Sequence, residues 1–326
     1  MKAIVRQDFG GPEQLQLAAV PEPVPRADEV RIRVRAFGIN RAEQYFRQGL
    51  WGDVDPISGI ECVGEVDDDP SGALLPGQRV MALMGGMGRT RPGSYADYVC
   101  APATNVVPVR SRLDWSELGA LPESCATAWA CLHDNLQLRR GDTLLLRGAT
   151  SALGQAATAL AALAGVDVIA TTRTVERSAL ARQLGARWSV VEGDGMSDAL
   201  REIAPAGVDA VLDLVGTRTL LESLRLARRG GRVCMAGFLG GHEPLAAFDP
   251  LHHLPSGRHL SFFGSAFVFG TAEFPLSDIP FQRLVDAIER GELRLPAPLL
   301  FGMDEIQDVH RRLDLQTART KMVVMT

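Results

Sequence analysis

Short apolar runs separated by turn residues fill the first 110 residues. Val30–Arg35 alternates strictly between aliphatic side chains and arginines, as a strand does when one face is buried and the other is wet. Prolines and paired glycines interrupt the chain between such runs, a pattern typical of strands joined by turns. The predicted strands are Ala3–Val5, Leu15–Ala18, Val30–Ala36, Cys62–Val66, Arg79–Leu83 and Ala96–Val99. Their close spacing predicts a compact barrel, with one helix at Arg41–Arg47.

From about Trp115 onward the pattern changes to strands and helices in alternation. Such alternation predicts a parallel, doubly wound sheet with helices on its faces. The predicted strands are Leu144–Leu146, Val166–Thr171, Arg187–Val191, Val208–Asp213, Arg232–Ala236 and Leu260–Val268. The predicted helices are Ser116–Leu121, Thr127–Leu136, Ala156–Leu163, Val175–Leu184, Met196–Ile203 and Thr219–Leu226.

The end of the chain is expected to return to the first domain, with helices at Leu284–Glu289 and Asp304–Leu313 and a strand at Lys321–Val324. The sequence therefore predicts an α/β protein of two domains. Residues 115–271 form the doubly wound domain, and residues 1–114 together with 272–326 form the barrel-type domain.

Composition narrows the class of protein. The chain has 326 residues, too many for one ordinary core, and its 46% hydrophobic and 22% charged residues are those of a globular protein. A net charge of −5 is not that of a nucleic-acid-binding protein, which usually carries an excess of positive charge. No apolar run approaches the roughly 20 residues of a membrane helix, and the first residues lack the apolar core of a signal peptide. Five cysteines stand singly, which favours reduced thiols. We expect a cytoplasmic protein with no nucleic-acid or membrane partner.

The stretch Thr143–Gly154, TLLLRGATSALG, joins a predicted buried strand to an alanine-rich helix through a turn with glycine at both ends. A strand, a turn of small residues and a helix N-terminus form the usual binding place of a dinucleotide pyrophosphate, because free N–H groups and the helix dipole point at the anion. Ser151 stands where the middle glycine of the motif would be. The spacing alone is a weak signal, but its place in an alternating fold predicts a Rossmann domain.

The end of the next predicted strand indicates which dinucleotide binds. Folds that take NAD usually carry an acid there, to hold the ribose 2′-hydroxyl. This chain instead has Thr172 and Arg173, with Arg177 one helical turn further on. Guanidinium groups bind phosphate through bidentate, charge-assisted hydrogen bonds, so the pattern favours NADPH. A solvated helix face is the alternative for the two arginines.

The remaining cofactor contacts are expected at the other strand ends, since ligands of such sheets lie outside the carboxyl ends of the strands. The predicted cofactor-binding residues of the Rossmann domain are Thr127, Gly148, Ala149, Thr150, Ser151, Ala152, Leu153, Thr172, Arg173, Arg177, Val215, Gly237, Phe238 and Leu239.

The chain resembles the zinc-independent quinone oxidoreductases related to zeta-crystallin, a branch of the medium-chain dehydrogenase/reductase superfamily. The resemblance runs along nearly the whole chain, and it rests most on FGINRAEQYFRQG and RGATSALGQAA. Weaker pieces in the same order are MKAIV with FGGPEQL, SGIECVGEV, PGQRVMAL, GSYADYV, GGRVCMAGF and TKMVV. It implies that the first domain is a GroES-like, β-barrel-type catalytic domain, that the protein is a homodimer, and that hydride passes from NADPH to a small-molecule quinone or α,β-unsaturated carbonyl compound.

The resemblance also bears on metal. Zinc-dependent members carry a cysteine and a histidine where this chain has Asn40-Arg41 and Ile60, and Met84–Gly93 contains none of the cysteines of their structural zinc lobe. A zinc site needs three or four converging ligands, and the histidine pair His252-His253 lies in a loop with no cysteine nearby. We expect no metal.

Without a metal, hydride transfer is carried by the cofactor, and the protein supplies orientation and polar contacts. The resemblance implies that Asn40 lies near the nicotinamide and that Tyr45 donates a hydrogen bond to the substrate carbonyl, with water as the alternative proton source. It places Trp51 and Phe267 beside the substrate, Phe267 also in a segment that closes over the cofactor and pairs subunits. Lys321 matches a lysine of the family, although a charged strand end is the simpler interpretation.

Two departures from the family pattern leave questions open. Ser151 narrows the approach to the pyrophosphate while adding a hydroxyl, and Glu192 stands where relatives place a tyrosine against the 2′-phosphate, which weakens the preference for NADPH. An enoyl reductase for acyl thioesters and a catalytically idle NADPH-binding redox sensor or structural protein remain alternatives to a reductase of quinones or enones.

Overall fold

The computed structural model describes residues 1–326 and divides into two compact units. Unit 1 comprises residues 1–126, 265–290 and 296–326, and unit 2 comprises residues 127–264 and 291–295. The boundaries fall at 126 and 265, where the sequence suggested 114 and 272. Unit 1 reaches further because α2 (Trp115–Leu118) packs on strands β3, β4 and β15 of its sheet.

Unit 2 is built on a six-stranded sheet in the order β10-β9-β8-β11-β12-β13, in which every neighbouring pair is parallel. The order runs outward in both directions from the first strand, as in a doubly wound sheet. Its strands are β8 (Thr143–Arg147), β9 (Asp167–Thr172), β10 (Trp188–Val191), β11 (Val208–Asp213), β12 (Ala227–Met235) and β13 (His259–Phe262).

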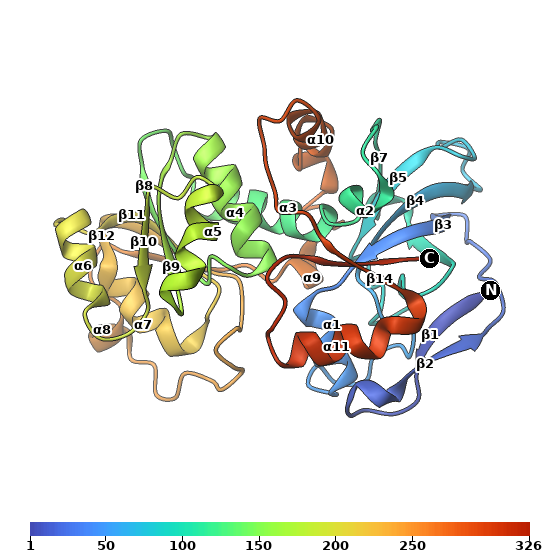
Figure 1. Ribbon diagram of the computed structural model, residues 1–326, viewed down its shortest axis with the longest axis horizontal. Coiled ribbons are helices and arrows are strands. Elements are labelled where there is room, and N and C mark those ends of the chain that lie inside the picture. The colour runs from blue at the N-terminus through green and yellow to red at the C-terminus, as the bar shows by residue number, and fades with distance from the viewer. The chain divides into compact units, whose positions relative to one another are not determined.

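Helices connect these strands and cover the sheet. Helix α4 packs on β8 and β9, and α5 on β9 and β10, while α7 packs on β11 and β12 (Figure 1). The helices of unit 2 are α4 (Ala152–Leu163), α5 (Ser178–Gln183), α6 (Met196–Ile203), α7 (Thr217–Leu226) and α8 (Pro250–His253). Helix α3 (Pro122–Ala130) contains the boundary at residue 126 and continues as a π-helical turn at Cys131–Asn135. A short 3₁₀ turn at Val175–Arg177 precedes α5.

Unit 1 is centred on the ten-residue strand β3 (Glu29–Gly38), which pairs antiparallel with β4, β6 and β15. The sheet has the order β14-β15-β3-β4-β5-β7, and β1 and β2 form a separate antiparallel pair. The other strands are β1 (Lys2–Arg6), β2 (Leu15–Ala19), β4 (Glu61–Asp68), β5 (Arg79–Leu83), β6 (Tyr98–Pro102), β7 (Val106–Pro108), β14 (Leu299–Gly302) and β15 (Met322–Met325). The pairing of β15 with β3 confirms that the end of the chain returns to the first domain.

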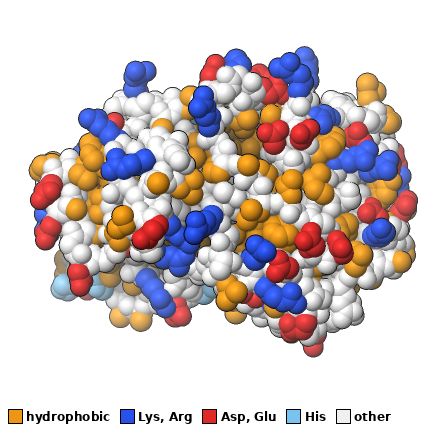
Figure 2. Space-filling view, viewed as in Figure 1, with side chains coloured by type: hydrophobic (Ala, Val, Ile, Leu, Met, Phe, Trp, Pro, Cys, Tyr) orange, Lys and Arg blue, Asp and Glu red, His pale blue; other side chains and the backbone are white.

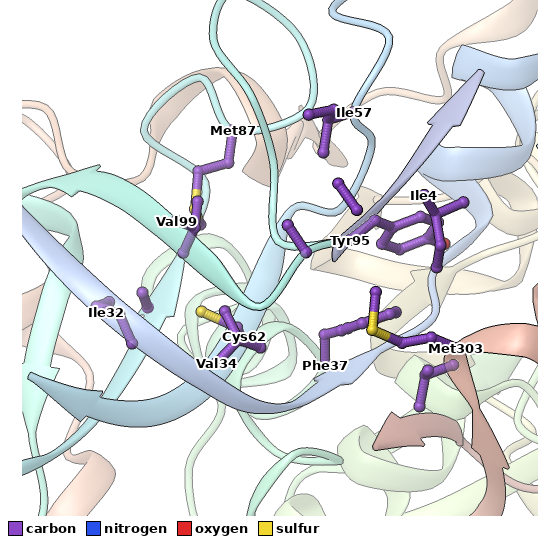
Figure 3. Packing of buried hydrophobic residues seen from close by; sticks show 14 of the residues in the cluster. Ile4, Ile32, Val34, Phe37, Ile57, Cys62, Met87, Tyr95, Val99 and Met303 are labelled. Atoms are coloured by element: carbon purple, nitrogen blue, oxygen red, sulfur yellow. The ribbon is translucent and has the colours of Figure 1, made fainter. Parts of the chain in front are cut away.

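The core of unit 1 lies under β3, whose apolar side chains point inward as the alternation predicts. Phe37 stacks on Tyr95 with ring centroids 4.7 Å apart, and Figure 3 shows both beside Ile4 and Met303. The helices of this unit are α1 (Arg41–Arg47), α2, α9 (Ser265–Val268), α10 (Phe281–Glu289) and α11 (Ile306–Asp314), with 3₁₀ turns at Pro12–Gln14, Ala103–Asn105, Leu276–Asp278 and Met303–Glu305.

One predicted element is wrong. The sequence suggested a strand over Leu260–Val268, but the strand ends at Phe262 and Ser265–Val268 forms the helix α9. Gly264 interrupts the apolar run and allows the backbone to change direction. The β-prone residues on both sides of it made the run look like one strand. The short strands β7 and β14 were not predicted, because neither shows an alternating pattern long enough to recognise.

The surface carries both signs of charge. Figure 2 shows Lys and Arg side chains interspersed with Asp and Glu over the face in view. None of the helices combines the length and the apolar character that crossing a bilayer requires.

Candidate functional site

The glycine loop of unit 2 lies between β8 and α4, as predicted. Gly148 has a φ of +80°, a conformation that favours glycine. A Cβ at Gly154 would lie 2.3 Å from the Gly148 carbonyl oxygen, so only glycine lets the helix approach the turn this closely. Ala152 and Leu153 follow in the first helical turn, where backbone N–H groups have no partner inside the helix. The loop therefore offers the geometry of an anion site at a helix N-terminus.

Ser151 bonds to the backbone of the glycine loop itself. Its hydroxyl accepts a hydrogen bond from the Gly154 N–H at 3.0 Å and donates one to the Gly148 carbonyl at 2.9 Å. Ser151 is thus the N-cap of α4 and closes the turn itself. Its hydroxyl therefore fixes the loop, with its proton donated to the Gly148 carbonyl.

A basic side chain contacts this loop. Arg177 donates a hydrogen bond to the Thr150 hydroxyl at 3.3 Å, so the 3₁₀ turn after β9 touches the glycine loop. Arg173 is exposed just beyond the end of β9, where Thr172 is held by its hydrogen bond to the Thr174 carbonyl at 2.9 Å. Arg177 and the Thr150 hydroxyl thus meet at the edge of the loop, and such groups suit a phosphate; Arg173 lies exposed at the end of the neighbouring strand.

An ion cluster around the buried Arg147 lies directly before the loop. Arg147, the residue before Gly148, is 2% exposed and binds the carboxylates of Glu192 (2.9 Å from Nε) and Glu222 (2.7 Å from Nη1). Burial lowers the pKa of its guanidinium, but the hydrogen bonds and charges of these carboxylates raise it more. Thr171 donates a further bond to Glu192 at 2.7 Å. The Glu192 carboxylate is therefore directed at Arg147 and Thr171.

At the end of β11, the turn is held by the strand's last residue, Asp213, whose side chain is fully buried. Its carboxylate accepts hydrogen bonds from the Val215 and Gly216 N–H groups, both at 2.9 Å. A Cβ at Gly237 would lie 2.6 Å from the Leu214 carbonyl oxygen, so that turn also requires close backbone approach.

The structure brings only some of the predicted cofactor-binding residues of unit 2 together at the glycine loop. Leu239 lies close over Gly148, since a Cβ there would meet its Cδ1 at 2.8 Å. Phe238 instead stacks on His242, with centroids 5.0 Å apart, and Ala149 and Thr127 are buried, the latter in α3.

In unit 1, Asn40 and Lys321 belong to one cluster. Lys321 forms an ion pair with Glu61 at 2.7 Å and donates a hydrogen bond to the Asn40 side-chain oxygen, while the Asn40 amide donates to Glu61 at 2.8 Å. Lys321 is 6% exposed and Glu61 fully buried. The simpler interpretation of Lys321 as a charged strand end is wrong. Lys2 and Lys321 are the only lysines among 34 basic residues, and one of them is buried here.

Glu43 adds a second buried carboxyl group to this cluster. Its oxygens accept hydrogen bonds from the backbone N–H groups of Asn40 (2.8 Å) and Ile60 (3.1 Å), which ties the start of α1 to the chain before β4. Complete burial raises the pKa of Glu43 to about 7, against the opposing effect of backbone N–H groups, that of Ile60 foremost, and of the Lys321 charge. The same surroundings raise the pKa of Lys321, because Glu61 and other carboxylates outweigh its burial.

The three predicted aromatic residues lie in a row. The rings of Tyr45 and Trp51 are 5.5 Å apart, and those of Trp51 and Phe267 are 5.3 Å apart. Tyr45 is buried and Phe267 is 56% exposed, so the row runs from the interior of unit 1 to its surface. Burial raises the pKa of Tyr45 to about 12, although Arg41 opposes it, so the phenol is neutral at physiological pH. A neutral phenol is a hydrogen-bond donor.

The residues present do not fit a zinc ion. No group of three or more His, Cys, Asp or Glu side chains converges in a way that could hold a metal. At the place where the resemblance puts two zinc ligands, Asn40 and Glu61 already bind the ammonium of Lys321. A second cation beside that ammonium is electrostatically unfavourable.

Comparison with known proteins agrees with this architecture. The model of the alcohol dehydrogenase GroES-like domain matches residues 26–111, and that of the zinc-binding dehydrogenase domain matches residues 152–281. Human quinone oxidoreductase is 28% identical over 338 positions, which cover 100% of this chain and 98% of that protein. The chain belongs to the medium-chain dehydrogenase/reductase family, and its full-length relatives are quinone oxidoreductases. It is accordingly an oxidoreductase, with the predicted Rossmann and GroES-like folds.

Solved structures resemble the chain over its full length. Escherichia coli quinone oxidoreductase, solved with NADPH, superposes with a TM-score of 0.89 at 20% identity, with 100% of both chains covered. A mycobacterial protein, also solved with NADPH, gives a TM-score of 0.88 at 26% identity, again with 100% of both chains covered.

Several residues of these clusters were not found from the sequence. Arg147, Glu43 and Glu61 lie in short buried segments whose partners come from distant parts of the chain. Glu61 carried a signal, since it follows Ile60 in the SGIECVGEV segment of the family resemblance. For Arg147 the clue was a charged residue at the end of an apolar segment, since such a residue is rarely buried unless paired. For Glu43 it was the spacing of a capping box that begins at Asn40.

Proposed function

We propose that the protein is an NADPH-dependent reductase that transfers hydride, without a metal, to quinones or to α,β-unsaturated carbonyl compounds. The observation that carries the proposal is the row Tyr45, Trp51 and Phe267, a partly exposed aromatic surface next to a neutral phenol. Such a surface favours a flat, conjugated acceptor.

The cofactor assignment rests on unit 2. The helix N-terminus and the close-packed glycines would hold the pyrophosphate, and Arg173, Arg177 and Thr150 would hold the 2′-phosphate. The NADPH named for the two solved relatives supports this assignment. NADPH supplies the hydride, so the protein need only bind, orient and protonate.

The side chains that would orient the nicotinamide and donate a hydrogen bond to the acceptor belong to unit 1. Tyr45 would donate its phenolic hydrogen bond to the acceptor carbonyl, where negative charge develops. Asn40 would orient the nicotinamide, since Lys321 and Glu61 fix the direction of its amide. Water is the alternative donor, and a Tyr45→Phe variant that keeps full kcat would favour water.

The test measures NADPH oxidation with quinones, enones and acyl thioesters, with and without a chelator. Turnover of a quinone or enone that the chelator leaves unchanged supports the proposal. Turnover of thioesters alone indicates an enoyl reductase, NADPH binding without turnover indicates a sensor or structural protein, and loss of activity with the chelator contradicts the metal-free mechanism.

Arg173→Ala tests the 2′-phosphate contact. Losing a charge-assisted bond should raise the Kd for NADPH by about tenfold or more and leave that for NADH almost unchanged. Titration of both cofactors against protein fluorescence measures this. Equal losses for the two cofactors would show that the guanidinium does not contact the 2′-phosphate.

We also propose that the protein is a homodimer that pairs through β13. This strand is the edge of the unit 2 sheet, and its Leu260 and Phe262 are 40% and 54% exposed. A free edge with exposed apolar side chains invites pairing with another strand, and a second copy offers the same edge. Sedimentation should show a dimer for the native chain and a monomer for Phe262→Lys; a native monomer would contradict the proposal. The cytoplasmic location stays a prediction.

A further inference from the structure

Arg89 lies at the exposed end of the aromatic row. Its guanidinium carbon is 4.6 Å from the centre of the Phe267 ring, and Phe267 in turn lies beside Trp51. The backbone around it is fixed: the Arg89 N–H donates to the Gly86 carbonyl at 3.0 Å, and its carbonyl accepts from the Asp55 N–H at 2.9 Å. These hydrogen bonds hold the turn from which the side chain extends toward Phe267.

The guanidinium of Arg89 makes no hydrogen bond and no ion pair within the protein. Two residues along the same loop, Arg91 binds Glu29 at 2.6 Å. Burial alone lowers the pKa of Arg89, with no carboxylate acting against it. A half-buried cation is thus held without a counter-charge.

Other arginines that stack on aromatic rings differ from Arg89 in this respect. Arg31, Arg187 and Arg312 each also bind a carboxylate. Arg6 and Arg79 each donate to backbone carbonyls. Stacking occupies only the face of a guanidinium, so its five N–H donors remain directed outward in the plane. In Arg89 these donors have no protein acceptor.

We propose that Arg89 binds an anionic group of the acceptor, a carboxylate, sulfonate or phosphate, while the conjugated part of the acceptor lies on Phe267 and Trp51. The inference rests on the proposed reductase function and narrows its substrate class to negatively charged quinones or enones. The planar fork of arginine suits such groups because it donates two parallel hydrogen bonds. The aromatic row and the cation then recognise different parts of one molecule.

A pair of acceptors that differ by one anionic group tests the proposal: 1,2-naphthoquinone-4-sulfonate and 1,2-naphthoquinone. Arg89→Ala should lower kcat/KM for the sulfonate by about tenfold or more, the value of a hydrogen bond to a charged group, and leave the neutral quinone and the KM for NADPH unchanged. Arg89→Lys, which keeps the charge but loses the fork, should fall between the two. Arg26→Ala removes an exposed cation from the same unit and should behave as the native protein.

Ionic strength gives a second readout. For the native protein, the ratio of kcat/KM for the sulfonate to that for the neutral quinone should decrease with added salt. For Arg89→Ala the same ratio should not change with salt. Equal losses for both quinones, or a loss confined to NADPH affinity, would overturn the proposal. Thermal unfolding of each variant checks that it is folded.

Binding separates this proposal from the reductase function on which it rests. Quenching of tryptophan fluorescence by each quinone, with Trp51→Phe to identify the reporter, requires no turnover. The native protein should bind the sulfonate more tightly than the neutral quinone, and Arg89→Ala should abolish this difference. That result establishes the anion site even if neither quinone is reduced. Reduction of both quinones without any effect of Arg89→Ala refutes the anion site and leaves the reductase function standing.

Discussion

The two units bury charge in different ways. In unit 2, Arg147 lies between Glu192 and Glu222, whose side chains are 23% and 41% exposed, so water shares in solvating both carboxylates. In unit 1, Lys321 lies among the completely buried carboxyl groups of Glu43 and Glu61. Burial raises the pKa of Glu43 because the carboxylate loses its water, and the charge of Glu61 adds to the effect, while Lys321 opposes it. The comparison indicates that the exposure of the acids, more than the number of charges, distinguishes the two clusters.

The largest effect is expected when the unit 1 cluster loses its cation. Lys321→Met keeps the length of the side chain but leaves Glu61 buried without its partner, which should lower the free energy of unfolding by about 4 kcal/mol. Urea unfolding measures the change, and Lys2→Met at an exposed position is the matched control. A loss no larger than that of the control would mean that the ion pair does not stabilise unit 1.

The corresponding change in unit 2 should be smaller. Arg147→Met should cost about 2 to 3 kcal/mol, because Glu192 and Glu222 can regain water when the guanidinium is removed. The same unfolding experiment applies, and NADPH affinity should fall with it, since Arg147 directly precedes the glycine loop. If this variant is less stable than Lys321→Met, exposure of the acids is not what separates the two clusters.

The smallest of the three effects depends on pH. Glu43 has a folded pKa of about 7, above its ordinary value of 4.5, so between these values the folded state keeps a proton that the unfolded state has lost. Its contribution is therefore present at low pH and is lost as the pH rises, about 2 kcal/mol between pH 5 and pH 8.

Glu43→Gln cannot titrate and isolates this contribution. The difference in unfolding free energy between the native chain and Glu43→Gln should shift by that amount over the pH range, to the disadvantage of the native chain. Parallel pH profiles for the two proteins would show that Glu43 is ionised throughout, as in a cluster with enough positive charge.

Periodicity was sufficient for most of the fold. The alternation in Val30–Arg35 and the apolar runs of β8 and β11 gave strands because each residue's environment repeats along its own element. The helix Arg41–Arg47 was predicted with its observed bounds. Leu260–Val268 failed because apolar residues continue across Gly264 while the backbone changes direction.

For the candidate site, local motifs located the groups but not their partners. The glycine loop was recognisable because its strand, turn and helix are contiguous, yet the capping role of Ser151 depends on a hydroxyl direction that the sequence does not contain. The link between Asn40 and Lys321 spans 281 residues. Arg89 and Phe267 are likewise neighbours only after folding.

The sequence by itself determined the two-domain plan, the glycine loop, the basic end of β9 and the family. These depend on the order of residues within single segments. Only the tertiary structure decided which charges meet: Lys321 with Glu61, Arg147 with Glu192 and Glu222, and Arg89 with an aromatic ring in place of a carboxylate. Charge pairing acts over a few ångströms in space, and distance along the chain does not reveal which side chains come that close.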